Sequence, residues 1–145
     1  MLVQLLPDQV MHYWDLVKEA LENTLPPYVT DSDKKMEEMQ MSFLMCKAVF
    51  WIYVNSEPRV IFCLTTRVIE DEFTGSRSLE ITSIFSYSKI MGEEWIDGLE
   101  TIKKYAKGKN CTKIIAYTDE PLVIKITQKL GFEAKYTFIE YLLEE

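Results

Sequence analysis

The clearest pattern of apolar and polar positions lies in the second half of the chain. Residues 93–107 carry apolar side chains with the period of a helix, and this apolar stripe consists of Trp95, Leu99, Ile102 and Ala106. A short apolar run at residues 114–117 predicts a buried strand. Residues 120–131 then predict a second helix. Pro121 suits its first turn, where the missing N–H needs no partner, and Gly131 suits the position after its last turn.

The first half of the chain predicts two helices and four strands. Asp8 can cap the first helix, which Pro26 and Pro27 are expected to stop. The apolar face of this helix consists of Val10, Trp14, Val17 and Leu21. The second helix is expected to begin at Asp31 or Ser32, and its apolar stripe consists of Met36, Met39 and Phe43. Strands rich in aromatic and β-branched residues are expected at residues 2–6, 48–54, 59–69 and 79–87.

Two more strands are expected at the C-terminal end, one from Phe132 onward and one at residues 137–143. The predicted order is therefore β-α-α-β-β-β-α-β-α-β-β, in a single mixed α/β (α+β) domain that spans residues 1–145. We expect a sheet of about six or seven strands with about four helices. The strands at residues 79–87 and 114–117 should run parallel, because the intervening helix supplies the crossover that parallel neighbours need. They should diverge at their C-terminal ends, around a ligand cleft.

Composition narrows the functional classes. The chain has 16 basic and 23 acidic residues, with a net charge of −7. This balance disfavours a nucleic-acid surface, which needs a basic stripe to neutralise phosphates. No apolar run approaches the roughly 20 residues that cross a bilayer, so no membrane contact is expected. Cys46, Cys63 and Cys111 are too far apart for a CxxC pair and indicate free thiols in a reducing compartment. A cytoplasmic protein is the expectation.

The chain lacks the residues that several kinds of catalytic site require. His12 is the single histidine, and it lies off the apolar face of its predicted helix, so a surface position is expected. One histidine leaves little room for a Ser-His-Asp or Cys-His arrangement, and three scattered cysteines predict no zinc site. The chain also has no GxGxxG pattern and no P-loop. We therefore expect no metal cofactor.

The order of elements resembles the GNAT superfamily of N-acetyltransferases over essentially the whole chain. The resemblance is best in the C-terminal half, where a strand precedes a helix that ends in Lys129, Leu130, Gly131 and Phe132. Membership would imply that acetyl-CoA is the cofactor and that an amine is the substrate. GNAT enzymes bind the cofactor's pyrophosphate through R/Q-x-x-G-x-G/A. In this chain the matching segment is Lys89, Ile90, Met91, Gly92, Glu93 and Glu94.

This segment has two interpretations. Lys89 can stand for the basic residue and Gly92 for the first glycine, and a helix N-terminus attracts phosphate. Glu94, however, replaces the expected Gly or Ala and adds bulk and negative charge where two phosphates should lie. On the alternative interpretation, Glu93 and Glu94 complement the dipole of the helix that begins there, which stabilises by about 0.3–1 kcal/mol each.

The resemblance also implies two candidate catalytic residues. Thr127 takes the place of the tyrosine that protonates the departing thiolate in many GNAT enzymes, although an aliphatic hydroxyl is a shorter and poorer acid. Glu80 takes a strand position comparable to that of the family's acidic base. Glu80 can equally be a solvent-facing residue of an alternating strand.

Two functions therefore stay open. The first is an acetyl-CoA-dependent N-acyltransferase that acts on an amine. The second is a GNAT-shaped binding or assembly module with weak or no catalysis. For the second, the segments Phe73–Leu79 and Ile115–Asp119 look similar to divergent GNAT-like proteins of tailed phages. That resemblance would imply a protein partner, a homo-oligomer or assembly into a virion.

Overall fold

The computed structural model describes residues 1–25 and 32–144. Their elements follow the order β1 (Leu2–Leu5), α1 (Pro7–His12), α2 (Trp14–Glu22), α3 (Ser32–Leu44), β2 (Ala48–Val54), β3 (Val60–Glu70), β4 (Arg77–Ser86), α4 (Gly92–Gly108), β5 (Lys113–Ala116) and α5 (Pro121–Lys129). Within this part of the chain, none of the helices is long and apolar enough to cross a membrane.

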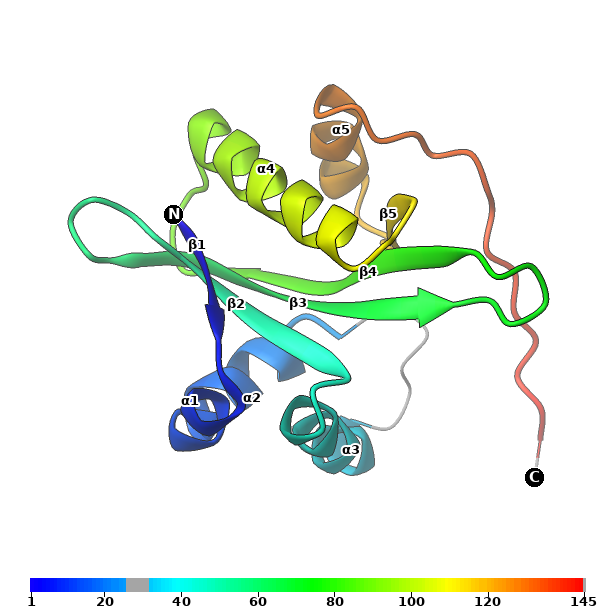
Figure 1. The fold of residues 1–145 in the computed structure, drawn as a ribbon, viewed down its shortest axis with the longest axis horizontal. Helices are drawn as coiled ribbons and strands as arrows, with labels where there is room; N and C mark the ends of the chain where they lie inside the picture. The colour runs from blue at the N-terminus through cyan, green and yellow to red at the C-terminus, as the bar shows by residue number, and fades with distance from the viewer. Residues whose placement is uncertain (26–31, 145) are drawn as a thin grey trace.

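One sheet organises the fold, and its strands lie in the order β1-β2-β3-β4-β5. Strands β1 to β4 pair antiparallel with their neighbours, while β4 and β5 are parallel. Helix α4 makes the crossover between the parallel pair. Figure 1 shows three layers, with α1, α2 and α3 on one face of the sheet and α4 and α5 on the other.

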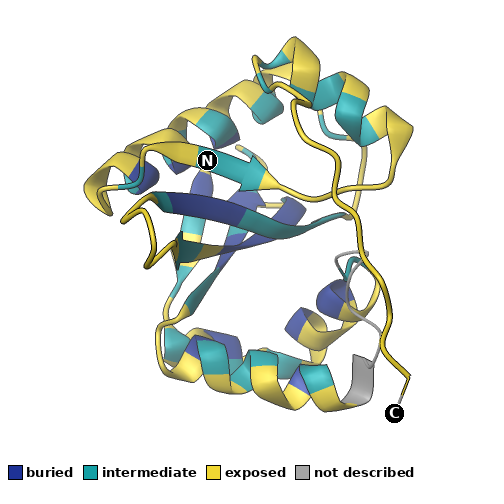
Figure 2. Cartoon of the chain, turned by 90° about the vertical axis from the view of Figure 1, so that its right-hand side faces the viewer, coloured by how far each residue is buried: buried dark blue, intermediate teal, exposed yellow. Residues whose placement is uncertain are grey.

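Each face of the sheet has its own apolar core. Toward α4, buried side chains of the sheet pack against Ile102 and Ala106, and the sheet residues include Trp51, Phe62, Leu64 and Leu79. Toward α1–α3, Phe50 and Cys63 pack against Val10, Val17, Ala20, Leu21, Met36 and Phe43. Alternate residues of each strand serve opposite cores, as the two-residue period of a strand requires. Figure 2 shows the buried positions concentrated along the sheet and on the helix faces toward it.

Helix α4 approaches the sheet closely, and its apolar stripe lies where the sequence predicts. Ile102 and Ala106 are buried, while Trp95 and Leu99 are half-buried. A Cβ atom on Gly98 would lie 3.3 Å from the ring of Phe62, which is tighter than ordinary van der Waals contact. The missing side chain at this position therefore allows the helix to sit close to β3.

The sequence predicts a single N-terminal helix, and this prediction is wrong. The chain forms two helices, α1 and α2, which meet at Tyr13 with φ −104° and ψ 27°, outside the helical range. Asp8 lies in the first turn of α1 and does not cap it, because the N-cap residue is Leu6. The bend lets Val10 and Val17, on different helices, enter the same core. The expected stop at Pro26 and Pro27, and the start at Asp31, lie outside the described residues.

The two C-terminal strands expected from Phe132 and at residues 137–143 are also absent from the described part of the chain. After α5, residues 132–144 run without strand pairing, and the sheet ends at β5. The described chain therefore has five strands and five helices. In Figure 1 this segment runs from α5, past the edge of the sheet, toward the side that carries α3. The residues that predicted these strands have no neighbouring strand to pair with in the described chain.

Candidate active site

Strands β4 and β5 are parallel at one edge of the sheet, as the sequence predicts, and their pairing ends part-way along β4. Their parallel pairing runs from Ser78 opposite Lys113 to Ile81 opposite Ala116. Strand β4 then continues to Ser86, and β5 ends. From Thr82 onward, no described strand pairs with the β5 side of β4. The backbone groups on that side of β4 are therefore available to a ligand in extended conformation.

A β-bulge lies directly after the last pair of β4 and β5. Thr65 pairs with Ser83 and Thr66 pairs with Ile81, so Thr82 is an extra residue in β4. The Thr82 hydroxyl donates a hydrogen bond of 3.3 Å to the Thr65 carbonyl oxygen. A bulge bends its strand and increases the local twist, and bulges are frequent next to active sites. Here the bulge lies at the point where β5 ends and β4 continues without it.

The segment after β4 leads into the N-terminus of α4. Lys89 is exposed, Ile90 packs against the core on the α4 face, and Gly92 is the first residue of α4. The Glu94 carboxylate folds back and accepts a hydrogen bond of 2.8 Å from the Met91 N–H. Glu94 thus satisfies one of the helix's unpaired N–H groups, which agrees with its interpretation as a helix-stabilising acid.

Glu93, Glu94 and Asp97 lie near this end of α4, and the N-terminal ammonium of Met1 lies 3.6 Å from Asp97 Oδ2. Tyr53 donates a hydrogen bond of 2.9 Å to Asp97 Oδ2. Burial is the main cause that raises the pKa of Tyr53 to about 12, and the hydrogen bond to Asp97 and the charges of Asp97, Glu94 and Glu93 raise it further. These negative charges act on the buried Tyr53, and they also oppose the binding of an anion at the start of α4.

Thr127 lies beside a small apolar cavity between the sheet, α4 and α5. The cavity has a volume of about 50 Å³, room for only a few heavy atoms. Its lining residues include Phe62, Ile84, Trp95, Leu99, Leu130 and Phe132. The Thr127 hydroxyl is 2.9 Å from the Val123 carbonyl oxygen and 3.0 Å from that of Ile124. This proton is held within α5, so Thr127 is badly placed to serve as an acid.

Glu80 is not the solvent-facing residue that one interpretation of its strand predicts. Its side chain is only 1% exposed, and Arg67 Nη2 lies 3.2 Å from Glu80 Oε2. Arg67 is the residue directly opposite on β3, and its side chain is 46% exposed. A carboxylate can be buried at this position because a cation neutralises it and donates hydrogen bonds to it.

Sequence reasoning missed Arg67, although a signal for it exists. The hairpin turn fixes Glu70 opposite Arg77, and the pair Arg67 and Glu80 lies three residues further from the turn on each strand. Register counted from the turn would have paired these two residues.

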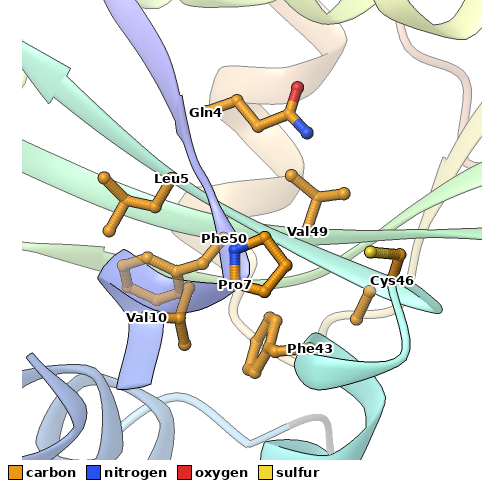
Figure 3. A pocket seen from close by; sticks show the side chains of 9 residues that line it. Gln4, Leu5, Pro7, Val10, Phe43, Cys46, Val49 and Phe50 are labelled. Carbon is orange, nitrogen blue, oxygen red and sulfur yellow. The ribbon is translucent and has the colours of Figure 1, made fainter. Parts of the chain in front are cut away.

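A second small cavity lies on the opposite face of the sheet. Its volume is about 40 Å³, and Figure 3 shows apolar side chains gathered around it with the Cys46 sulfur at one side. The lining residues are Gln4, Leu5, Pro7, Val10, Phe43, Cys46, Ala48, Val49 and Phe50. Ligand pockets are usually about 300–1,000 Å³, so this space is a packing defect between β1, α1, α3 and β2.

Other reactive groups do not form a site. His12 is exposed on α1, as the sequence predicts. Burial raises the pKa of the Cys63 thiol to about 11, so this cysteine is not a thiolate nucleophile near neutral pH. Among the described residues, no group of three or more His, Cys, Asp or Glu side chains could hold a metal ion.

Comparison with known proteins gives structural similarity without sequence similarity. No protein-family model matches the chain, and no curated protein matches it significantly. A probable acetyltransferase superposes with a TM-score of 0.71 at 14% identity, covering 100% of this chain and 97% of its own. The aminoglycoside acetyltransferase meta-AAC0020, from an uncultured soil sample and in complex with sisomicin, gives a TM-score of 0.70 at 12% identity, with 99% and 96% covered.

A third similar structure contains the cofactor. It is a predicted acetyltransferase with acetyl-CoA from Clostridium acetobutylicum, with a TM-score of 0.66, 16% identity, and 98% of this chain and 95% of that chain covered. Identities this low support an inference about fold alone. The parallel pair β4 and β5, the bulge at Thr82 and the similarity over whole chains lead to one conclusion. This chain has the fold of the GNAT acetyltransferases.

Proposed function

We propose that this protein binds an acyl-CoA thioester between β4 and β5 and transfers the acyl group to an amine. The observation that carries the proposal is the end of the pairing between the two strands directly after Ile81 and Ala116, with the bulge at Thr82. The open side of β4 offers N–H and C=O groups at backbone spacing, which suits the amide groups of an extended pantetheine arm.

The two ends of the cofactor fit this chain unequally. The thioester end fits, because open backbone of β4 lies next to the bulge. The pyrophosphate end fits poorly. The Glu94 carboxylate already accepts a hydrogen bond from the Met91 N–H. The charges of Glu93 and Asp97 lie close by. The N-terminal ammonium of Met1 lies 3.6 Å from Asp97, and Lys89 is the cation of the segment that could offset the two glutamates. We therefore expect weak cofactor binding.

Proton transfer would also receive little help from the candidate catalytic residues. In the transfer, the amine nitrogen forms the C–N bond, the C–S bond breaks, and the thiolate takes up a proton. Thr127 directs its hydroxyl into its own helix, and Glu80 is buried against Arg67. An acceptor that arrives as the free amine would need neither residue, so slow transfer is the expected behaviour.

Acetyl-CoA binding and turnover test the proposal. Saturation at 100 times the dissociation constant would stabilise the protein by about 2.7 kcal/mol, which a thermal melt detects. Acetyl-CoA should raise the melting temperature more than equal concentrations of adenosine diphosphate, and CoA release should accompany acylation of an amine panel. Lys89→Ala should reduce the shift, and Glu94→Gly should increase it, because that change removes a charge and frees the Met91 N–H.

Lys104→Ala is the matched control, since Lys104 is an exposed lysine on α4 and lies far from the N-terminus of that helix, which Lys89 precedes. No shift in the native protein or in Glu94→Gly would contradict the proposal.

A binding or assembly module without catalysis is the second candidate. The capping contact of Glu94 and the internal hydrogen bonds of Thr127 favour it, since both groups serve helix stability. Assembly into a virion is one form of this candidate. The three similar structures are all described as acetyltransferases, so they give it no support. Acetyl-CoA binding without CoA release on any amine would favour this second function.

A further inference from the structure

The cavity between the sheet, α4 and α5 presents an apolar surface. Its volume is about 50 Å³, and apart from Gly98 and Thr127 its lining residues are aliphatic or aromatic. The hydroxyl of Thr127 is held by the carbonyl oxygens of Val123 and Ile124 inside α5. The walls of this cavity therefore suit a hydrocarbon group better than a charged one.

The cavity adjoins the part of β4 that continues without β5. Ile81 is the last residue of β4 that pairs with β5, and Ile84 lies beyond the bulge at Thr82. Both residues line the cavity, so it extends across the point where β5 ends. Helix α5 follows β5 in the chain and lies with α4 on one face of the sheet (Figure 1). The space between these helices thus meets the open backbone of β4, where the thioester of the proposed substrate would bind.

We propose that this cavity receives the acyl chain of the thioester and selects propionyl-CoA over acetyl-CoA. The inference rests on the proposed acyl transfer and adds its acyl specificity. An apolar cavity of about 150 Å³ holds benzene, with its six carbon atoms, so a cavity of about 50 Å³ has room for about two. The propionyl group has two carbon atoms beyond its carbonyl carbon and fills this space, whereas the single methyl of an acetyl group leaves part of it empty.

Chain length and charge should both affect transfer. Each CH₂ group that leaves water for an apolar site favours binding about fourfold. A hexanoyl chain is too long for the space and would displace the packed side chains around it. A succinyl chain would bring a carboxylate against walls that offer it no partner. The reaction is the same for every chain: the amine nitrogen bonds to the acyl carbon and loses a proton, the C–S bond breaks, and the thiolate takes up a proton.

Leu99 is the residue that best tests the size of the cavity. It lies on α4, is half-buried, and lines the cavity. Leu99→Ala would enlarge the space, and Leu99→Phe would fill it. Leu122 provides the matched control, because it is a leucine on α5 that is 66% exposed and lies outside the lining.

Thermal melts measure the selection without turnover. At equal concentrations, propionyl-CoA should raise the melting temperature of the native protein more than acetyl-CoA does. Leu99→Phe should reverse this order, and Leu122→Phe should keep it. Equal shifts with the two thioesters in the native protein would overturn the proposal, as would the native order in Leu99→Phe.

Kinetics with a series of thioesters measure the selection during transfer. In the native protein, kcat/KM should be about fourfold higher for propionyl-CoA than for acetyl-CoA. It should be at least about tenfold lower for hexanoyl-CoA and succinyl-CoA than for propionyl-CoA. Leu99→Ala should raise the ratio of hexanoyl to propionyl transfer at least about tenfold, while Leu122→Ala leaves the ratio unchanged. Each ratio compares two substrates on one variant, so partial unfolding of that variant cancels.

The outcomes separate this specificity from the transfer itself. Transfer that proceeds with the same chain preference in the native protein and in both Leu99 variants would overturn the cavity's role and leave the acyltransferase standing. Neither binding nor transfer with any of the four thioesters would overturn both.

Discussion

Arg67 and Glu80 form an ion pair across β3 and β4, with Arg67 Nη2 3.2 Å from Glu80 Oε2. The two partners differ in exposure, since Glu80 is buried while the side chain of Arg67 is 46% exposed. The pair lies two residues before the bulge at Thr82, on the part of β4 that still pairs with β5. Glu80 therefore stabilises the sheet where the cleft begins, and its burial argues against a role as a base that meets the substrate.

The first prediction follows from this asymmetry. Arg67→Ala should lower the free energy of unfolding by about 3 kcal/mol, because it leaves a buried carboxylate without its main cation. Glu80→Gln should cost less, about 1–2 kcal/mol, since the remaining guanidinium can be hydrated. Urea unfolding of both variants measures the difference. Lys103→Ala is the control, because its pair with Glu100 is exposed and should contribute less than about 1 kcal/mol. Equal costs for Arg67→Ala and Lys103→Ala would contradict this view of the pair.

The second prediction concerns the apolar stripe of α4. Ile102 is 1% exposed, so Ile102→Ala should cost about 2–5 kcal/mol, as for other buried truncations. Leu99 shares the stripe but is half-buried and borders the small cavity below α5. Leu99→Ala should therefore cost clearly less than Ile102→Ala in the same urea titration. A larger loss for Leu99 would mean that the cavity closes in solution and that α5 packs more tightly against α4.

Periodicity predicted most of the fold, because the elements that form it bury one face against a continuous sheet. Residues 93–107 were expected as a helix, and α4 is Gly92–Gly108. The strand predictions were wrong where strand formation depends on a partner in the tertiary structure. Tyr136 to Leu143 has the composition of a strand, yet nothing local supplies the neighbouring strand that would pair with it. The break between α1 and α2 at Tyr13 is a similar case. The apolar stripe of the helix continues on both sides of Tyr13, so the local sequence does not indicate the break.

The strand pair that frames the candidate site was predictable from the sequence, but the side-chain arrangement around it was not. The sequence predicted that β4 and β5 run parallel, because a parallel pair requires the crossover that α4 provides. It could not indicate that the Glu94 carboxylate folds back onto the Met91 N–H, since this depends on a side-chain rotamer. Glu80 was misjudged for another reason. Strand alternation identifies which face a side chain occupies but not whether a cation lies opposite on that face.

The third prediction tests Thr127. Its hydroxyl bonds within α5, so Thr127→Val should change the rate of any acyl transfer by less than about twofold and leave the fold intact. A general acid would contribute about 10²–10⁴-fold, so the two roles are easily separated by CoA release at saturating acetyl-CoA. Thr101→Val is the matched control, because its hydroxyl also bonds back to its own helix, on α4. A loss of 100-fold for Thr127→Val alone would identify Thr127 as the acid.

The last prediction concerns alkaline stability. Burial, followed by the hydrogen bond to Asp97, raises the pKa of Tyr53 to about 12, and the unfolded value is about 10. A tyrosine whose pKa is higher in the folded state contributes stability that is fully present below pH 10. That contribution is lost as the pH rises through about 12, because the unfolded chain ionises first. The loss amounts to about 2–3 kcal/mol.

Tyr53→Phe isolates this effect from the other tyrosines, which titrate alike in both proteins. At pH 7 the native protein should be more stable than Tyr53→Phe by about 1–2 kcal/mol, since the variant loses a hydrogen bond to a carboxylate. Between pH 10 and 12 this advantage should shrink and then reverse in urea titrations, because the loss exceeds it. An advantage that stays constant over that range would show that neither burial nor the hydrogen bond to Asp97 holds Tyr53 protonated in the folded state.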